Sequence, residues 1–204
     1  FRRAIELNPN YPTAHQWYAS YLKLMGRHDE ALAKANKAVE LDPFSPLMHA
    51  NRGFVLHYAR RYDEAILEQR QVMGMDPAAA HLLLGLPYIQ KGMYPQAVSQ
   101  LQTGSAAAGA NSSELTAFLG YAYAKAGQRA EAQRILADLR DHVPPFFLVY
   151  VNLALGHKDQ ALTLLEKAYE ERDLRIGLLK VAPELDPLRG DPRCLGGVVA
   201  RKEG

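Results

Sequence analysis

The fold is decided by a stretch of sequence that occurs twice. Residues 29–43 read DEALAKANKAVELDP, and residues 63–77 read DEAILEQRQVMGMDP. The two copies start 34 residues apart, and Pro9 ends an earlier copy of the same closing sequence at the same spacing. A fixed period of this size indicates a protein built from stacked copies of one structural unit.

The opening triplet of this stretch has weaker copies downstream. Each copy follows a predicted helix break, and glycine, which readily takes the left-handed conformation, is the usual residue there. An acid or a proline then suits the first turn of the next helix. Each unit is therefore expected to be a helix, a tight turn and a second helix. The later triplets are Pro95-Gln96-Ala97, Ala130-Glu131-Ala132 and Asp159-Gln160-Ala161, and the breaks are Gly26, Arg60-Arg61, Gly92, Gly127 and Gly156.

Apolar residues inside each unit follow the period of a helix. Tyr18, Leu22 and Met25 lie three, four and seven residues apart. No stretch alternates as a half-buried strand does, so the fold class is predicted to be all-α. A single helix pair cannot bury its apolar face, and neighbouring pairs must therefore stack into an α-solenoid.

The pattern resembles the tetratricopeptide repeat, whose signature is W-x2-L-G-x2-Y, then A-x3-F, then P. This resemblance implies a right-handed superhelix of antiparallel helix pairs. It covers about residues 1–173. The positions that fit are Phe1, Ala4, Pro9; Ala31, Ala38, Pro43; Gly53, Ala65, Pro77; Leu84, Gly85, Tyr88, Ala97; and Leu119, Gly120, Tyr123, Ala132, Pro144.

We expect one array, with the end of a truncated repeat at 1–11, repeats at 12–45, 46–77, 78–112, 113–141 and 142–173, and a capping segment at 174–204 that frays from residue 195. The chain starts at Phe1 without a methionine, as a piece of a longer protein would. The tail resembles the end of repeat arrays in large bacterial regulators, which carry a winged-helix domain, a Ser/Thr kinase or an adenylate cyclase.

Some positions depart from the family signature. His15, His49 and His81 occupy the slot of the large aromatic residue, where packing within the helix pair is the simplest explanation. Pro87 lies inside a predicted helix and should kink it. Residues 104–113 are small and polar, which predicts a longer, looser connection.

The sequence gives no sign of an enzyme, a metal site or a cofactor. The net charge of +2 and the absence of a basic stripe argue against nucleic acid as a partner of this segment. The longest apolar stretch, Phe146 to Leu155, is too short to span a membrane, and a cytoplasmic location is expected. The single cysteine, Cys194, is expected to be inert, and no nucleotide, nucleophile or zinc motif is present.

The remaining candidate site is the concave groove that the resemblance implies. Its lining is apolar and aromatic, which suits a partner helix or peptide, although some of these residues are expected to pack against neighbouring helices instead. Two alternatives stay open: self-association through the open end of the solenoid, and a small-ligand sensor near Pro87. A carboxylate clamp is not supported, because Gln16 stands where a lysine is needed. The groove residues are Gln16, Ser20, Lys23, Ala50, Phe54, His57, Tyr58, Leu82, Leu86, Ile89, Ala117, Tyr121, Lys125, Phe146 and Tyr150.

Overall fold

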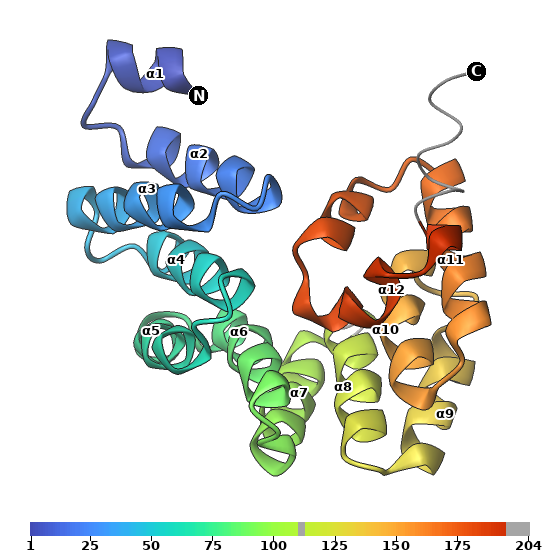
Figure 1. Cartoon of the computed structure of the whole chain (residues 1–204). Helices are drawn as coiled ribbons and strands as arrows, with labels where there is room; N and C mark the ends of the chain where they lie inside the picture. The colour runs from blue at the N-terminus through green and yellow to red at the C-terminus, as the bar shows by residue number, and fades with distance from the viewer. Residues whose placement is uncertain (110–112, 195–204) are drawn as a thin grey trace. The chain divides into compact units, whose positions relative to one another are not determined.

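The computed structural model describes residues 1–109 and 113–194, and all regular structure in these residues is helical (Figure 1). The fraying predicted for residues 195–204 lies outside the described residues. The helices are α1 (Arg2–Leu7), α2 (Pro12–Leu24), α3 (His28–Leu41), α4 (Pro46–Tyr58), α5 (Tyr62–Met75), α6 (Pro77–Gln90), α7 (Tyr94–Ala108), α8 (Ser113–Lys125), α9 (Arg129–Leu139), α10 (Pro145–Leu155), α11 (Lys158–Glu170), η2 (Leu174–Lys180), η3 (Pro183–Leu185) and α12 (Asp186–Arg189).

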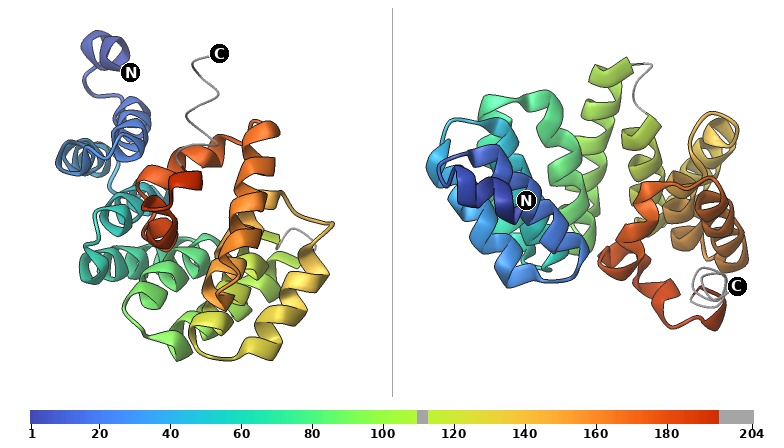
Figure 2. Two further views of the ribbon diagram at one scale, coloured as in Figure 1. Left: turned by 45° about the vertical axis from the view of Figure 1, so that its right-hand side comes forward. Right: turned by 90° about the horizontal axis from the view of Figure 1, so that it is seen from above.

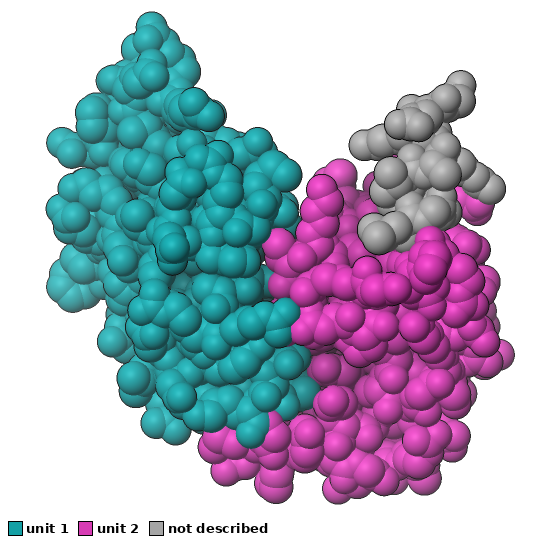
Figure 3. All heavy atoms as spheres, viewed as in Figure 1, with its two compact units in different colours: residues 1–91 teal, residues 92–204 magenta. Residues whose placement is uncertain are grey.

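The chain forms two compact units, residues 1–91 and 92–204 (Figure 3). Unit 1 contains α1 to α6, and unit 2 contains α7 to α12. The boundary falls inside the predicted repeat 78–112, so that its two helices belong to different units.

In unit 1, consecutive helices pack antiparallel, as α2 with α3, α4 with α5 and α5 with α6 (Figure 2). The first helices of successive repeats also lie side by side, as α2 with α4 and α4 with α6. The core between α2, α3 and α4 contains Tyr18, Leu22, Ala35 and Val55. Stacking of this kind is the α-solenoid arrangement predicted from the period of 34 residues.

The alanine of each repeated triplet explains how closely the helices pack. Because alanine has no side chain beyond Cβ, the second helix of each pair can approach the first. These alanines are 0–1% exposed, and they are Ala31, Ala65, Ala97, Ala132 and Ala161.

The predicted glycine breaks are confirmed. Gly26, Gly92, Gly127 and Gly156 all have positive φ, between 71° and 85°. Arg60 takes the corresponding place in the second repeat with φ of 62°, in a region that costs a residue with a Cβ about 1–2 kcal/mol.

In unit 2, α7 packs with α8, α8 with α9 and α10 with α11, and α8 lies beside α10. Gly120 marks a close approach of these helices: a Cβ at this position would lie 2.9 Å from Ile135 Cγ2 and 3.2 Å from Val151 Cγ2. The glycine of the family signature is therefore needed here for packing.

The structure differs from the sequence prediction at the end of α7, and α6 contains an internal proline. The connection predicted at 104–113 is shorter than expected, because α7 continues through a buried Gly104 to Ala108. Its last residues are three alanines, which have the highest helix propensity. Pro87 lies inside α6, which continues past it to Gln90.

Candidate protein-interaction surface

In unit 1, the residues predicted to line a groove divide into two sets by burial. Gln16, His57, Tyr58, Leu86 and Ile89 are buried, whereas five others keep part of their surface in solvent. Since a partner can contact only the second set directly, the accessible candidates in this unit are Ser20, Lys23, Ala50, Phe54 and Leu82.

Lys23 joins α2 to the aromatic side chains of α4. Its ammonium lies 4.8 Å from the centre of the Tyr58 ring and 5.4 Å from that of Phe54, which is cation–π geometry. The residue keeps part of its surface in solvent, but the surrounding protein desolvates its ammonium, and this lowers the pKa of Lys23 to about 8. Lys23 forms no ion pair with any residue in the described part of the chain.

Polar contacts join α2 to α4 and α4 to α5. Asn51 Nδ2 donates a hydrogen bond of 2.8 Å to Ser20 Oγ, and Gln69 Nε2 donates one of 3.2 Å to the carbonyl oxygen of Ala50. The ring of His57 meets Tyr58 edge-on, with centroids 5.3 Å apart. Ser20, Lys23 and Phe54 are thus held in one place by α2, α4 and α5.

In unit 2, most of the predicted groove residues are buried. Ala117, Tyr121, Phe146 and Tyr150 are 0–4% exposed, and only Lys125 is exposed. Tyr150 is surrounded by rings, with centroid distances of 4.9 Å to Phe118, 5.6 Å to Phe146 and 6.2 Å to Tyr121. The aromatic residues of α8 and α10 therefore contribute to packing between helices.

The first two histidines in the aromatic slot make the same hydrogen bond. His15 Nε2 lies 2.8 Å from the carbonyl oxygen of Pro9, and His49 Nε2 lies 2.9 Å from that of Pro43. Because a carbonyl only accepts, the ring nitrogen must donate. Each histidine thus ties the first helix of its repeat to the closing proline of the repeat before it. His81 is partly buried and follows Pro77 by four residues rather than six.

In the second repeat, a buried acid also contacts the histidine. Glu68 is 6% exposed, and its two oxygens lie 2.5 Å from His49 Nδ1 and 2.5 Å from a guanidinium nitrogen of Arg52. The sequence does not reveal this cluster, because nothing in the local pattern distinguishes Glu68 from the exposed acids of α5.

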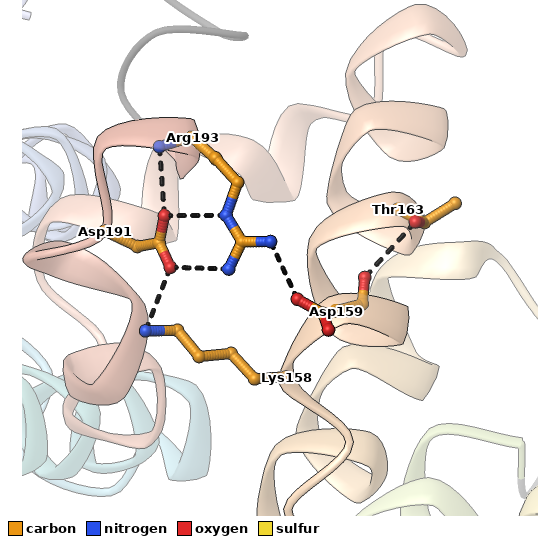
Figure 4. Close-up of polar contacts among 5 residues, drawn as sticks. All are labelled: Lys158, Asp159, Thr163, Asp191 and Arg193. Atoms are coloured by element: carbon orange, nitrogen blue, oxygen red, sulfur yellow. Dashed lines mark hydrogen bonds and ion pairs between the residues drawn. The ribbon is translucent and has the colours of Figure 1, made fainter.

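The tail packs against the last helix pair, η2 on α11 and η3 on α10. An ionic cluster fastens its end to the start of α11 (Figure 4). Arg193 donates to both oxygens of Asp191, at 3.0 and 2.9 Å, and to Asp159 Oδ1 at 2.7 Å. Lys158 Nζ lies 3.0 Å from the second oxygen of Asp191. The side-chain hydrogen bonds from Arg193, and after them the contact with Lys158, hold the pKa of Asp191 well below its usual range.

An apolar stripe is exposed along α2. Trp17 is 56% exposed, Tyr21 45% and Leu24 36%. The corresponding residues of the next repeat, 34 positions later, are Asn51, Val55 and Tyr58, and all three are buried. The stripe therefore occupies the helix positions through which a repeat packs against its neighbours.

Neither metal nor membrane chemistry is visible in the residues that the structure describes. They include no group of three His, Cys, Asp or Glu side chains that could hold a metal ion. No helix among them is long and apolar enough to cross a membrane. Cys194 is buried, and burial raises the pKa of its thiol, which reduces its reactivity.

Two family models of the tetratricopeptide repeat match the chain, at residues 1–33 and at residues 113–138. These matches support its assignment to the tetratricopeptide repeat family. A comparison with curated proteins finds no significant match.

Several solved structures are similar to this chain in fold. TTC0263, a thermophilic tetratricopeptide protein in Thermus thermophilus, has a TM-score of 0.67 at 21% identity and covers 86% of this chain and 99% of its own. PilW, a type IV pilus biogenesis factor, has a TM-score of 0.64 at 18% identity, and the match covers 91% of this chain and 86% of PilW. YrrB, described as having an unusual peptide-binding site, has a TM-score of 0.53 at 23% identity, and the match covers 87% of this chain and 95% of YrrB. At these identities the likeness shows the fold alone.

Proposed function

We propose that this chain is a non-catalytic scaffold that binds a segment of another protein on the first helices of its repeats. In unit 1 these helices are α2, α4 and α6, and the binding surface is centred on Phe54. The observation that supports the proposal best is the group formed by Lys23, Phe54 and Tyr58, where an aromatic side chain and a cation remain accessible on a rigid helical surface. Aromatic residues on such surfaces make effective anchors for a partner.

The repeat fold favours this function over catalysis. Stacked helix pairs present a long continuous surface, which suits an extended peptide or an amphipathic helix. The similar protein YrrB is described as peptide-binding. The regulatory role in a larger bacterial protein that the tail suggests is part of the same proposal, in which the scaffold brings a partner to an attached domain.

The experiment is a selection of displayed random peptides on the immobilised protein. Selected peptides should bind at least roughly tenfold more weakly to the Phe54→Ala variant, a loss of about 1.4 kcal/mol. Leu67→Ala is the matched control, because Leu67 is an exposed apolar residue on α5, a second helix of a repeat. Equal affinity for all three proteins would contradict the proposal.

Phe54 also packs against the cluster of Val72, Ala80 and Leu83, so its replacement could lower stability. Leu82→Glu provides a second variant, because Leu82 is a partly exposed groove residue on α6 that lies outside this cluster. Thermal unfolding of both variants shows whether a loss of binding is separate from a loss of fold.

A second candidate function, self-association, is favoured by the stripe of Trp17, Tyr21 and Leu24. The three exposed apolar side chains occupy helix positions that are buried in the next repeat, and an exposed apolar patch of this kind can mark a protein–protein interface. Multi-angle light scattering should show a species heavier than a monomer that Tyr21→Glu converts to monomer. A strictly monomeric wild-type protein at high concentration would contradict it.

A further inference from the structure

Acidic side chains are distributed unequally between the helices of unit 1. The first helices of the repeats, α2, α4 and α6, contain no Asp or Glu. Their paired second helices, α3 and α5, do carry acids, which are Asp29, Glu30, Glu40, Asp63, Glu64 and Glu68. The proposed binding surface therefore carries cationic and aromatic side chains without acids of its own helices.

Most cations of unit 1 that lie near an acid are already paired. Arg27 binds Glu30, Lys37 binds Glu40, and Arg61 binds Glu64. Arg52, on α4, binds the buried Glu68. Lys23 differs, because its ammonium is held against two rings, and no carboxylate among the described residues reaches it.

We propose that the partner segment is acidic and apolar, with a carboxylate that pairs with Lys23 beside an apolar side chain that packs on Phe54. This inference rests on the proposed function and specifies the chemistry of its ligand. A partly desolvated cation gains more from an added anion than an exposed one does, because the surrounding rings lower the local dielectric constant.

The position of Lys23 makes this pairing geometrically simple. Lys23 lies at the end of α2, and Ser20, one turn earlier, is fixed by its hydrogen bond to Asn51 of α4. A helix or strand that packs an apolar residue on Phe54 has its neighbouring polar positions within reach of the lysine. The small side chains of Ser20 and Ala50 leave room for that approach.

The test uses three fluorescent peptides of about a dozen residues. They share the same Leu and Phe positions and carry Glu, Gln or Lys at all others. We expect the Glu peptide to bind the wild-type protein about tenfold more tightly than the Gln peptide, and the Lys peptide to bind most weakly. Lys23→Met should remove the preference for Glu over Gln. Lys34→Met, which removes a lysine over the Tyr18 ring from α3, should preserve it.

The two proposals fail in different ways. The inference is overturned if the peptides bind through Phe54 but the Glu peptide is not preferred over the Gln peptide. It is also overturned if that preference survives Lys23→Met. Either result would leave the scaffold proposal standing. Binding that Phe54→Ala does not weaken for any peptide would overturn the scaffold proposal itself. Competition by a single-stranded oligonucleotide as effective as the Glu peptide would also overturn the acidic-peptide assignment.

Discussion

His49 Nδ1 lies 2.5 Å from Glu68 Oε1 in a contact that is buried on both sides and joins α4 to α5. Nε2 of the same imidazole donates a hydrogen bond to the carbonyl oxygen of Pro43, so this one side chain links two successive repeats. With Arg52 on the second carboxylate oxygen, the repeat depends on a small ionic cluster where the family signature has an aromatic residue.

Removal of this carboxylate should be costly. We expect Glu68→Ala to lower the free energy of unfolding by roughly 3 kcal/mol, because it leaves His49 and Arg52 without their acceptor inside the protein. The partial exposure of Arg52 places this value at the lower end for buried pairs. Urea unfolding measures it, and Glu64→Ala, at an exposed acid of the same helix, should cost less than about 1 kcal/mol. Equal losses in the two variants would contradict the structural role of the cluster.

Arg60 should be replaceable by glycine with a gain in stability. Its φ of 62° is unfavourable for any residue with a Cβ, and the four corresponding breaks are glycines. Relief of that conformation should outweigh the added entropy of the unfolded chain, for a net gain of about 0.5–1 kcal/mol. Thermal unfolding of Arg60→Gly should therefore shift upward, while Ala59→Gly, at a residue with φ of −78°, should shift downward. A downward shift for Arg60→Gly would show that its side-chain contacts outweigh the backbone cost.

The tail should stay docked in mild acid through Asp191. A carboxyl whose pKa is depressed in the folded state contributes stability above its ordinary pKa, and this contribution is lost only as the pH falls through the lower folded value. Hydrogen exchange of residues 179–189, corrected for the intrinsic rate, should thus show similar protection at about pH 4 and at pH 7, although ordinary Asp side chains are half protonated near pH 4. Asp191→Asn should remove the protection, and Asp159→Asn, which loses only the contact to Arg193, should weaken it slightly. Full protection in Asp191→Asn would refute this role.

Binding of an acidic peptide should depend on pH through Lys23. Burial lowers the pKa of Lys23 to about 8, and a bound carboxylate would raise it, so affinity is greatest where the lysine is charged and falls as the pH rises through about 8. The side chains that face its ammonium from α4 are Phe54 and Tyr58, with His57 beside Tyr58. Lys23→Arg stays charged and should flatten the profile between about pH 7 and 10. A wild-type affinity that is constant over this range would contradict the pairing.

The features that the sequence predicts correctly are local. Gly26 lies at the helix end that it determines, and Ala31 lies in the helix contact that it allows. The recurrence of such residues at a fixed spacing is therefore enough to predict these turns and contacts. The all-helical fold follows from the same recurrence.

The features that the sequence does not predict depend on neighbours distant in the chain. Glu68 is buried because His49 and Arg52, on another helix, face it. Tyr121 and Tyr150 have the helical position of groove residues, yet they are buried. Periodicity shows which face of a helix is apolar, but it does not show whether that face meets a partner or the next helix.

The most direct test of the proposed binding surface is photo-crosslinking to a peptide selected on the wild-type protein. A photoreactive benzoylphenylalanine would replace Ser20, on α2, or Leu67, on α5, and the crosslinked products would be mapped by mass spectrometry. We expect crosslinks from position 20 that excess unlabelled peptide suppresses, and none above background from position 67. Specific crosslinks from position 67 alone would place the partner on the second helices and contradict a binding surface on the first helices.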